Sequence, residues 1–272
     1  MTPLKQTYFL SDLHLGARYF RDPREQEKLV CRWLRSIAPT AGRIYLVGDI
    51  LDYWYEYRNV VPRGFVRFLG TLADLADSGI EITWLIGNHD IWIFDYLPSE
   101  LGIRVVDGVL REEINGHSFV IAHGDGLGPI PFAENIMRRT FRCRFLQRLF
   151  ASVHPRWTVG FAYWWSAKNR FRHHTGPKPQ PADPKPLLQW VSEQNARAAV
   201  PPEFYVFGHY HLMMQREVAG SKVTILGDWL SNMSFATFSG SDVVLHQLDL
   251  QKHENNRNFA PINSSNLTNS KS

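Results

Sequence analysis

Hydrophobic positions in the first half of the chain follow two alternating patterns. Short apolar runs that are partly β-branched predict buried strands. Four such runs are present: Tyr8–Leu10, Ile44–Val47, Ile82–Ile86 and Phe119–Ala122. Between them, apolar residues recur at helical spacing over 29–37 and again over 65–75. Strands that alternate with helices predict an α/β layered fold.

The first of these helices also carries the signals of a helix start. Asp22 is a typical N-cap residue, Pro23 suits the first helical position, and Glu25 lies where a capping box places its acidic residue. The sequence therefore predicts a helix that begins at Pro23 and packs its apolar stripe against the sheet.

The alternation stops after residue 128 and resumes after residue 200. Residues 129–200 contain no run typical of a strand, and Met137, Phe141, Phe145 and Leu149 recur every four residues with arginines between them. This pattern predicts a helical insertion, basic and aromatic. Strand-like runs return at Tyr205–Phe207, Val223–Leu226 and Asp242–Leu245. We therefore expect a core of residues 1–128 and 201–250, a cap of 129–200, and a disordered Asn- and Ser-rich tail over 251–272.

The amino-acid composition excludes several classes of protein. The 272 residues include only two cysteines, Cys31 and Cys143, which excludes a disulfide scaffold and a cysteine-rich zinc module. No apolar run approaches the roughly 18–20 residues of a membrane span. The N-terminus lacks an apolar signal region with a cleavage site, so we expect a cytoplasmic protein.

Charge is distributed unevenly. The formal net charge is +4, yet residues 137–178 hold ten Lys or Arg and no Asp or Glu, which leaves 20 basic and 26 acidic residues elsewhere. Such a segment predicts an anionic partner: phosphates, nucleic acid or an anionic membrane face. A solvated helix face is the alternative interpretation.

Five short polar motifs follow predicted strands, where α/β sheets build their sites. They are Ser11-Asp12-Leu13-His14, Gly48-Asp49-Ile50-Leu51-Asp52, Gly87-Asn88-His89-Asp90, Ala122-His123-Gly124-Asp125 and Gly208-His209-Tyr210-His211. Carboxylate, amide and imidazole donors together suit Mn²⁺, Zn²⁺ or Fe²⁺. Seven candidate ligands are too many for one ion and enough for two, provided that one carboxylate bridges. Paired ions are typical of phosphoryl displacement.

This series of motifs, which spans residues 7 to about 248, resembles the calcineurin-like metallophosphoesterase superfamily. The resemblance implies a two-sheet α/β sandwich with a helical cap insertion and a dinuclear metal centre. It implies one ion held by Asp12, His14, Asp49 and His211, and another held by Asp49, Asn88, His123 and His209. It also implies that Asp49 bridges the ions, that His89 acts beside the scissile phosphate, and that Asp52 and Asp90 orient ligands.

A narrower resemblance concerns three parts of the chain. Residues 49–54 (Asp-Ile-Leu-Asp-Tyr-Trp), the insertion, and residues 226–229 (Leu-Gly-Asp-Trp) are similar to the UDP-2,3-diacylglucosamine pyrophosphatases of lipid A synthesis. That similarity implies Mn²⁺-dependent hydrolysis of the substrate's pyrophosphate to UMP and 2,3-diacylglucosamine 1-phosphate. The best-known members carry Arg where this chain has His89.

The cap suits an acylated nucleotide sugar on physical grounds, because pyrophosphate attracts basic residues and acyl chains need an apolar groove. The expected substrate-binding residues are Asn88, His89, Ser166, Lys168, Asn169, Arg170 and His209. The aromatic residues Phe141, Phe145, Phe150, Trp157, Phe161, Trp164 and Trp165 either line an acyl groove or form core between cap helices. A basic cap also predicts loose association with the cytoplasmic face of the inner membrane.

Two rival functions fit the same sequence. One is another phosphoesterase of the superfamily, a nuclease or a phosphodiesterase. The apolar content of the cap discriminates, because a nuclease would need a basic groove rather than an acyl pocket. The other is a non-enzymatic protein that binds anions or membranes with a decayed site. The complete set of candidate ligands argues against the second rival.

Overall fold

The computed structural model describes residues 5–17, 20–158, 160, 182–248 and 261–263. Its strands are β1 (Gln6–Leu10), β2 (Ala41–Val47), β3 (Glu81–Leu85), β4 (Arg104–Val106), β5 (Leu110–Ile114), β6 (His117–Ala122), β7 (Phe204–Phe207), β8 (Met213–Val218), β9 (Ser221–Leu226), β10 (Ser234–Phe238), β11 (Val243–Leu248) and β12 (Pro261–Asn263). Its helices are α1 (Pro23–Ile37), α2 (Val66–Asp77), α3 (Tyr96–Leu101), α4 (Phe132–Arg142), α5 (Arg144–Ala151) and α7 (Lys185–Arg197). Every strand-like run identified in the sequence lies in one of these strands or overlaps it.

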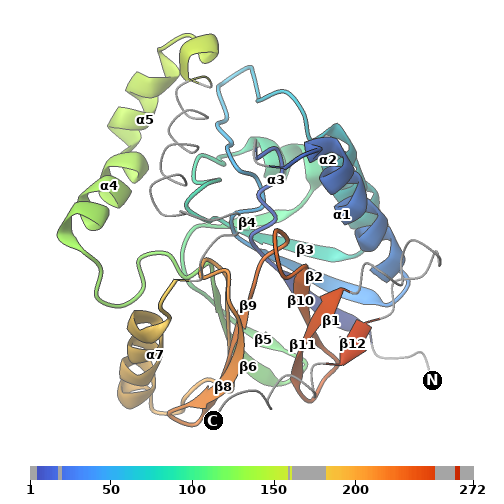
Figure 1. Ribbon diagram of the computed structural model, residues 1–272, viewed down its shortest axis with the longest axis vertical. Coiled ribbons are helices and arrows are strands. Elements are labelled where there is room, and N and C mark those ends of the chain that lie inside the picture. Colours follow the sequence, from blue (N-terminus) through green and yellow to red (C-terminus); the bar gives the residue numbers. More distant parts are fainter. Residues whose placement is uncertain (1–4, 18–19, 159, 161–181, 249–260, 264–272) are drawn as a thin grey trace.

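Two mixed sheets form the centre of the fold (Figure 1). One has the strand order β12-β11-β10-β1-β2-β3-β4, and the other has the order β5-β6-β7-β9-β8. Strands β1 to β4 run parallel to one another, as do β6, β7 and β9, while β10, β11, β12, β5 and β8 pair antiparallel with their neighbours. The predicted two-sheet α/β sandwich is confirmed.

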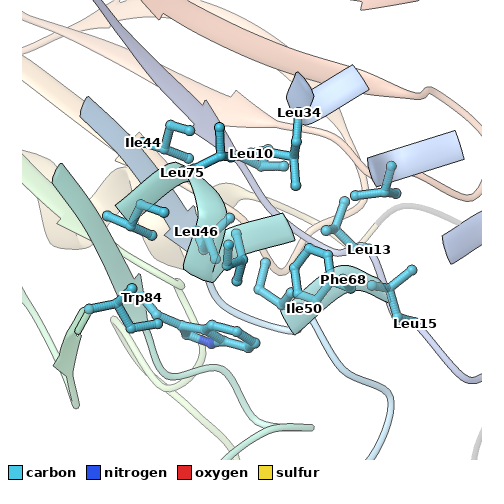
Figure 2. Packing of buried hydrophobic residues seen from close by; sticks show 14 of the residues in the cluster. Leu10, Leu13, Leu15, Leu34, Ile44, Leu46, Ile50, Phe68, Leu75 and Trp84 are labelled. Carbon is cyan, nitrogen blue, oxygen red and sulfur yellow. The ribbon is translucent and has the colours of Figure 1, made fainter. Parts of the chain in front are cut away.

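Three apolar layers hold these elements together. The largest lies between the seven-stranded sheet and helices α1 to α3, where Leu34, Leu46 and Phe68 are fully buried (Figure 2). A second layer fills the space between the sheets, and a third lies under α7. Alternate side chains of a strand point to opposite faces, so β2 serves two layers, with Leu46 in the first and Tyr45 in the second.

Helix α1 begins as its sequence predicts. The Asp22 side chain accepts hydrogen bonds from the amides of Arg24 and Glu25 at 3.0 and 3.1 Å, and Pro23 occupies the first helical position. The reciprocal half of a capping box is replaced by an ion pair between Glu25 and Lys28 at 2.5 Å.

The insertion between β6 and β7 is helical in its described parts. Helices α4 and α5 meet at Cys143, whose extended backbone (φ −71°, ψ 112°) ends one helix and begins the next. None of the described helices combines the length and the apolar character that crossing a bilayer requires. Within the tail for which the sequence predicts disorder, β12 is a three-residue strand that pairs antiparallel with β11.

A histidine on the surface links the two sheets. His117 contacts a Glu203 carboxylate oxygen through Nδ1 at 2.8 Å and the Gly240 carbonyl through Nε2 at 3.1 Å. Both ring nitrogens can donate only in the imidazolium form. The hydrogen bond to Glu203 raises the pKa of His117, and that to His117 lowers the pKa of Glu203.

The stability that His117 contributes should therefore depend on pH. A raised folded-state pKa means that the contribution is complete below the unfolded value of about 6.5 and is lost as pH rises through the folded value. We expect urea denaturation to show a larger difference between the wild type and His117→Gln at pH 6 than at pH 8.5. A difference that grows with pH would contradict this assignment.

Candidate metal centre

Six parallel strands bring the polar motifs to one place. In one sheet β1, β2 and β3 are neighbours, and in the other β6, β7 and β9 are neighbours. Asp12, Asp49 and Asn88 follow the first three strands, while His123 and His209 follow two of the others. Since parallel strands end at the same edge of a sheet, all five motifs converge where the two sheets meet.

Main-chain hydrogen bonds join the loops that carry these residues. The amide of Asp12 donates to the Gly48 carbonyl at 3.1 Å, and the amide of His14 donates to the Asp49 carbonyl at 3.0 Å. The Trp229 amide, from the second sheet, donates to the Asp12 carbonyl at 3.1 Å. The loops thus form one connected unit across both sheets.

The backbone at the centre adopts an unusual conformation. Five of the seven predicted ligands have a left-handed backbone with φ between 43° and 68°: Asp12, His14, Asp49, His209 and His211. Such a conformation costs a non-glycine residue roughly 1–3 kcal/mol and persists where the surroundings fix it. This concentration of strain is typical of a functional site.

Two motif glycines are needed because other groups approach them closely. A Cβ atom at Gly87 would lie 2.3 Å from Oδ1 of Asp49, and one at Gly208 would lie 2.7 Å from Oδ2 of Asp12. Any side chain at either position would displace one of the two buried carboxylates.

The predicted ligands form two groups that share one carboxylate. In the first, Oδ1 of Asp12 lies 3.8 Å from Nε2 of His14 and 3.6 Å from Nε2 of His211. In the second, ligand atoms of Asp49, His123 and His209 lie within 4.8 Å of one another.

Asp49 stands between the two groups. Its Oδ2 lies 3.8 Å from Nε2 of His14 and 3.3 Å from Nε2 of His123. Oδ1 of Asn88 lies 3.3 Å from the same His123 nitrogen. The structure therefore brings together all seven residues for which the sequence predicts metal binding.

The chemistry of this cluster fits divalent cations. Oδ1 of Asp12 is buried, and no hydrogen-bond donor reaches it from the described parts of the chain. Burial raises the pKa of Asp12. Burial acts in the same direction on Asp49, but His123, His89 and His14 hold the pKa of Asp49 well below its usual range. Two buried carboxylates among imidazoles need positive charge beside them, which divalent ions would supply.

The imidazole rings are oriented by acceptors behind them. Nδ1 of His123 lies 2.9 Å from the Val47 carbonyl, and Nδ1 of His211 lies 3.1 Å from Oδ2 of Asp228. In the neutral ring, a proton on Nδ1 would leave the Nε2 lone pair directed into the cluster, as metal-binding histidines require. Loss of hydration, together with the neighbouring His123, lowers the pKa of His209 to about 4, so this ring is neutral at physiological pH.

The sequence motifs assign no role to Asp228, which the structure brings next to the predicted ligand His211. Besides its contact with His211, its Oδ1 accepts hydrogen bonds from the amides of Leu230, Ser231 and Asn232 at 3.1, 2.7 and 2.9 Å. It therefore fixes both the histidine and the loop after β9. Its signal was a Gly-Asp pair directly after a strand, the same pattern that marks Asp49.

His89 has a ring nitrogen within 4.8 Å of ligand atoms of His14 and Asp49, and its side chain also reaches solvent. Its amide donates to Oδ1 of Asp49 at 2.8 Å, and its Nδ1 lies 3.0 Å from the Asp52 carbonyl. The His89 side chain is 25% exposed, whereas that of His14 is 2% exposed. With ring centroids 4.8 Å apart, His89 stands beside His14 on the solvent side of the cluster.

Asp52 and Asp90 contact the loops of the metal centre and fix their conformation. Oδ1 of Asp52 lies 3.5 Å from Nδ1 of His14. Asp90 accepts hydrogen bonds from the amides of Gly87 and Ile50 at 2.7 and 2.9 Å and from the Trp84 indole at 3.1 Å. Burial, with the neighbouring charge of Asp49, raises the pKa of Asp90 to about 6.

The basic insertion is only partly available to an anionic ligand. Nε of Arg138 donates to Asp125 at 3.0 Å, and Arg142 pairs with Asp107 at 3.4 Å. These pairs fasten α4 to the core. The predicted substrate residues Ser166, Lys168, Asn169 and Arg170, and the aromatic residues Phe161, Trp164 and Trp165, lie outside the described residues.

Known proteins resemble this chain in sequence. The family model for calcineurin-like phosphoesterases matches residues 6–213. A UDP-2,3-diacylglucosamine hydrolase from Porphyromonas gingivalis is 41% identical over 89% of this chain and 97% of its own length. One from Neisseria gonorrhoeae is 28% identical over 83% and 90% of the two chains. Among solved structures, Vacuolar Protein Sorting 29 from Cryptosporidium parvum matches with a TM-score of 0.48 and 13% identity, over 95% of this chain and 98% of that one.

The family model covers most of the chain and every motif of the cluster up to His211. The identity with the P. gingivalis relative is high enough to indicate common descent, and it extends over nearly the full length of both proteins. The chain belongs to the calcineurin-like phosphoesterase family.

Proposed function

We propose that this protein hydrolyses the pyrophosphate of UDP-2,3-diacylglucosamine to UMP and 2,3-diacylglucosamine 1-phosphate. The observation that carries the proposal is the convergence of two carboxylates, four histidines and one asparagine from both sheets. The UDP-2,3-diacylglucosamine hydrolases with which the chain aligns over most of its length supply the substrate. The enzyme is thus a hydrolase that acts on a phosphoanhydride bond.

Two divalent ions are part of the proposal, with Mn²⁺ as the metal. Asp12, His14, Asp49 and His211 would hold one ion, and Asp49, Asn88, His123 and His209 the other. When bound, such a pair supplies a nucleophilic water at neutral pH and stabilises charge on the phosphoryl oxygens. The donor set of oxygens and imidazoles without thiolate suits this metal.

His89, Asn88 and His209 complete the proposed contacts with the phosphates. His89 is exposed enough to reach a substrate, and its main chain is fixed by the hydrogen bond to Asp49. An imidazole there can stabilise developing charge or protonate the leaving group. Asp49 serves catalysis as the shared ligand.

Helices α4 and α5 are the proposed location for the acyl chains and for contact with the membrane. Their exposed apolar side chains include Phe132, Ile136, Met137, Phe145, Leu146 and Leu149. Exposed Arg139, Arg144 and Arg148 lie on the same two helices. Apolar and cationic side chains together suit an acylated anion and loose binding to an anionic membrane surface on the cytoplasmic side.

The proposed reaction can be tested by substrate comparison. The purified, Mn²⁺-loaded protein is incubated with UDP-2,3-diacylglucosamine, with its deacylated form and with bis(p-nitrophenyl) phosphate, and products are identified by mass spectrometry. We expect UMP and the 1-phosphate from the acylated substrate, at the highest kcat/KM of the three. Equal kcat/KM values for the acylated and deacylated nucleotides would contradict the proposed substrate and indicate a general phosphoesterase.

Apolar side chains of the cap should affect only the acylated substrate. Phe145 is 72% exposed and Leu149 is 59% exposed, and each CH₂ removed from water contributes about 0.8 kcal/mol. We expect Phe145→Ser with Leu149→Ser to lower kcat/KM for the acylated nucleotide by about tenfold or more. The matched control is Val66→Ser, which removes an exposed apolar side chain from α2. A similar loss with bis(p-nitrophenyl) phosphate would count against an acyl site on these helices.

A further inference from the structure

Two aromatic residues of the core donate hydrogen bonds to the main chain of the cap helices. The hydroxyl of Tyr55 donates to the Gln147 carbonyl at 2.6 Å, and the indole of Trp92 donates to the Phe141 carbonyl at 3.0 Å. Helix α4 ends one residue after Phe141, at the point where main-chain carbonyls lose their helical partners. The Gln147 side-chain amide also donates to the Phe141 carbonyl, at 2.8 Å. The junction between α4 and α5 is therefore bound through its backbone.

Ring contacts reinforce these hydrogen bonds. Trp92 stacks on Phe150 with centroids 5.5 Å apart and an interplanar angle of 22°, and it meets Phe141 edge-on at 5.6 Å. Tyr55 lies 5.1 Å from Phe150 and 5.4 Å from Trp92. We name these four residues, Tyr55 and Trp92 from the core with Phe141 and Phe150 from the helices, the aromatic latch. Such ring pairs stabilise a contact beyond the burial of their area.

The two latch residues of the core lie close in sequence to residues of the metal centre. Trp92 lies three residues after His89, and Tyr55 lies three residues after Asp52. A β-bridge joins Tyr55 to Trp92, and the Glu56 amide donates to the Trp92 carbonyl at 3.1 Å. The Asp52 carbonyl in turn contacts Nδ1 of His89. The segments after β2 and β3 thus hold the proposed phosphate site at one end and the cap at the other.

Buried Glu56 makes this pair of segments rigid. Its carboxylate accepts hydrogen bonds from the amides of Phe94, Asp95 and Tyr96 at 2.5, 2.9 and 3.2 Å, and from the Trp54 indole at 3.0 Å. Four donors on one buried carboxylate fix the chain directly after Trp92. The hydrogen bonds of Glu56 therefore fix the core residues of the latch without any contact from the cap.

We propose that Tyr55 and Trp92 are positioning residues that set the place of α4 and α5 relative to the metal centre. They thereby determine the preference for substrates that contact both at once. A substrate with phosphates at the centre and acyl chains on the helices needs a fixed distance between the two. A small phosphodiester needs the centre alone. The proposal rests on the proposed function for its substrate, whereas the latch itself rests only on the contacts above.

The test uses the variants Tyr55→Phe and Trp92→Phe, singly and together, in the full-length protein. Each variant removes a donor and keeps an aromatic ring. Tyr205→Phe is the matched control, because it removes a buried hydroxyl of β7 that donates to Asn195 of α7 at 2.7 Å, away from the cap helices α4 and α5. Kinetic constants are measured with UDP-2,3-diacylglucosamine and with bis(p-nitrophenyl) phosphate. Bound metal and hydrogen exchange of the α4 and α5 amides are measured in parallel.

We expect each latch variant to lower kcat/KM for the acylated nucleotide by about three- to tenfold, which corresponds to one hydrogen bond. The small diester should change much less, metal content should equal that of the wild type, and exchange in α4 and α5 should become faster. The ion pair between Arg138 and Asp125 still holds α4, so the cap is loosened and not released. The control should match the wild type in all of these measurements.

Two results would overturn the proposal. One is an equal fall for both substrates at full metal content, which would place the latch residues in the general fold of the centre. The other is unchanged exchange in α4 and α5, which would show that the latch does not hold the cap. If the wild type does not act on UDP-2,3-diacylglucosamine, the proposed function fails, and the exchange measurement still decides whether the latch exists.

Discussion

Replacing Asp49 by alanine should abolish turnover and reduce bound metal to less than one ion per chain. Oδ2 of Asp49 faces His14 at 3.8 Å and His123 at 3.3 Å, which belong to the two different groups of predicted ligands. Its Oδ1 is engaged by the amide of His89 at 2.8 Å. One substitution therefore removes the shared carboxylate and also loosens the segment that carries Asn88 and His89. Both ions should be lost because paired ions depend on the group between them to offset their repulsion.

Elemental analysis of Mn²⁺-loaded, desalted protein measures this effect directly. Asp77→Ala is a suitable control, since Asp77 is an exposed aspartate at the end of α2. Asp49→Asn separates charge from shape, because it keeps the volume and one oxygen but removes the negative charge. We expect the asparagine variant to retain its fold by circular dichroism and to bind less metal than the wild type. Full occupancy by two ions in Asp49→Ala would contradict the assignment of a shared ligand.

The sequence predicts the layers of this fold well because its strands are buried on both faces. Parallel strands covered by helices and by a second sheet appear as continuous apolar runs, as in Ile44–Val47 and Tyr205–Phe207. The start of α1 is also local, since Asp22 and Pro23 act on the next few residues of the chain. The convergence of the motifs follows from parallel topology, which places the carboxyl ends of the parallel strands at one edge of each sheet.

Contacts made between distant residues could not be predicted in the same way. Asp228 lies 17 residues after His211, and only the folded sheet brings its carboxylate to the imidazole. The latch is a second example, because Tyr55 and Gln147 are separated by 92 residues. The spacing of aromatic residues in the cap is compatible both with an acyl groove and with a core between the cap helices. The structure places Phe141 and Phe150 against the core and leaves Phe145 exposed.

The charge of a segment of the chain does not show which of its residues can bind a ligand. Residues 137–178 hold no acidic residue, yet Arg138 and Arg142 meet Asp125 and Asp107 from the core. Net charge describes the field of a segment, whereas the ligand it can bind depends on which charges are already paired. An anionic ligand would therefore depend more on residues such as Arg139 and Arg144, which form no ion pair within the described part of the chain, than on these two.

Replacing His89 by alanine should leave both metal ions in place and remove most of the turnover. The hydrogen bond that joins this residue to Asp49 comes from its main-chain amide, so the substitution keeps it. The lost imidazole stands on the solvent side of the cluster, where it can meet a phosphoryl oxygen or the leaving group. General acid–base contributions amount to about 10²–10⁴-fold in rate, and we expect a decrease of kcat within this range.

The variant His89→Arg distinguishes the two roles open to this imidazole. A guanidinium stays charged and can stabilise phosphoryl oxygens, but it cannot give up a proton at neutral pH. Recovery of turnover by arginine would assign His89 to charge stabilisation, and continued loss would assign it to proton transfer. His117→Gln is the control, because His117 begins β6 at the end opposite to His123 and should leave turnover unchanged. Metal analysis accompanies each assay, since loss of an ion from His89→Ala would show that this histidine is itself a ligand.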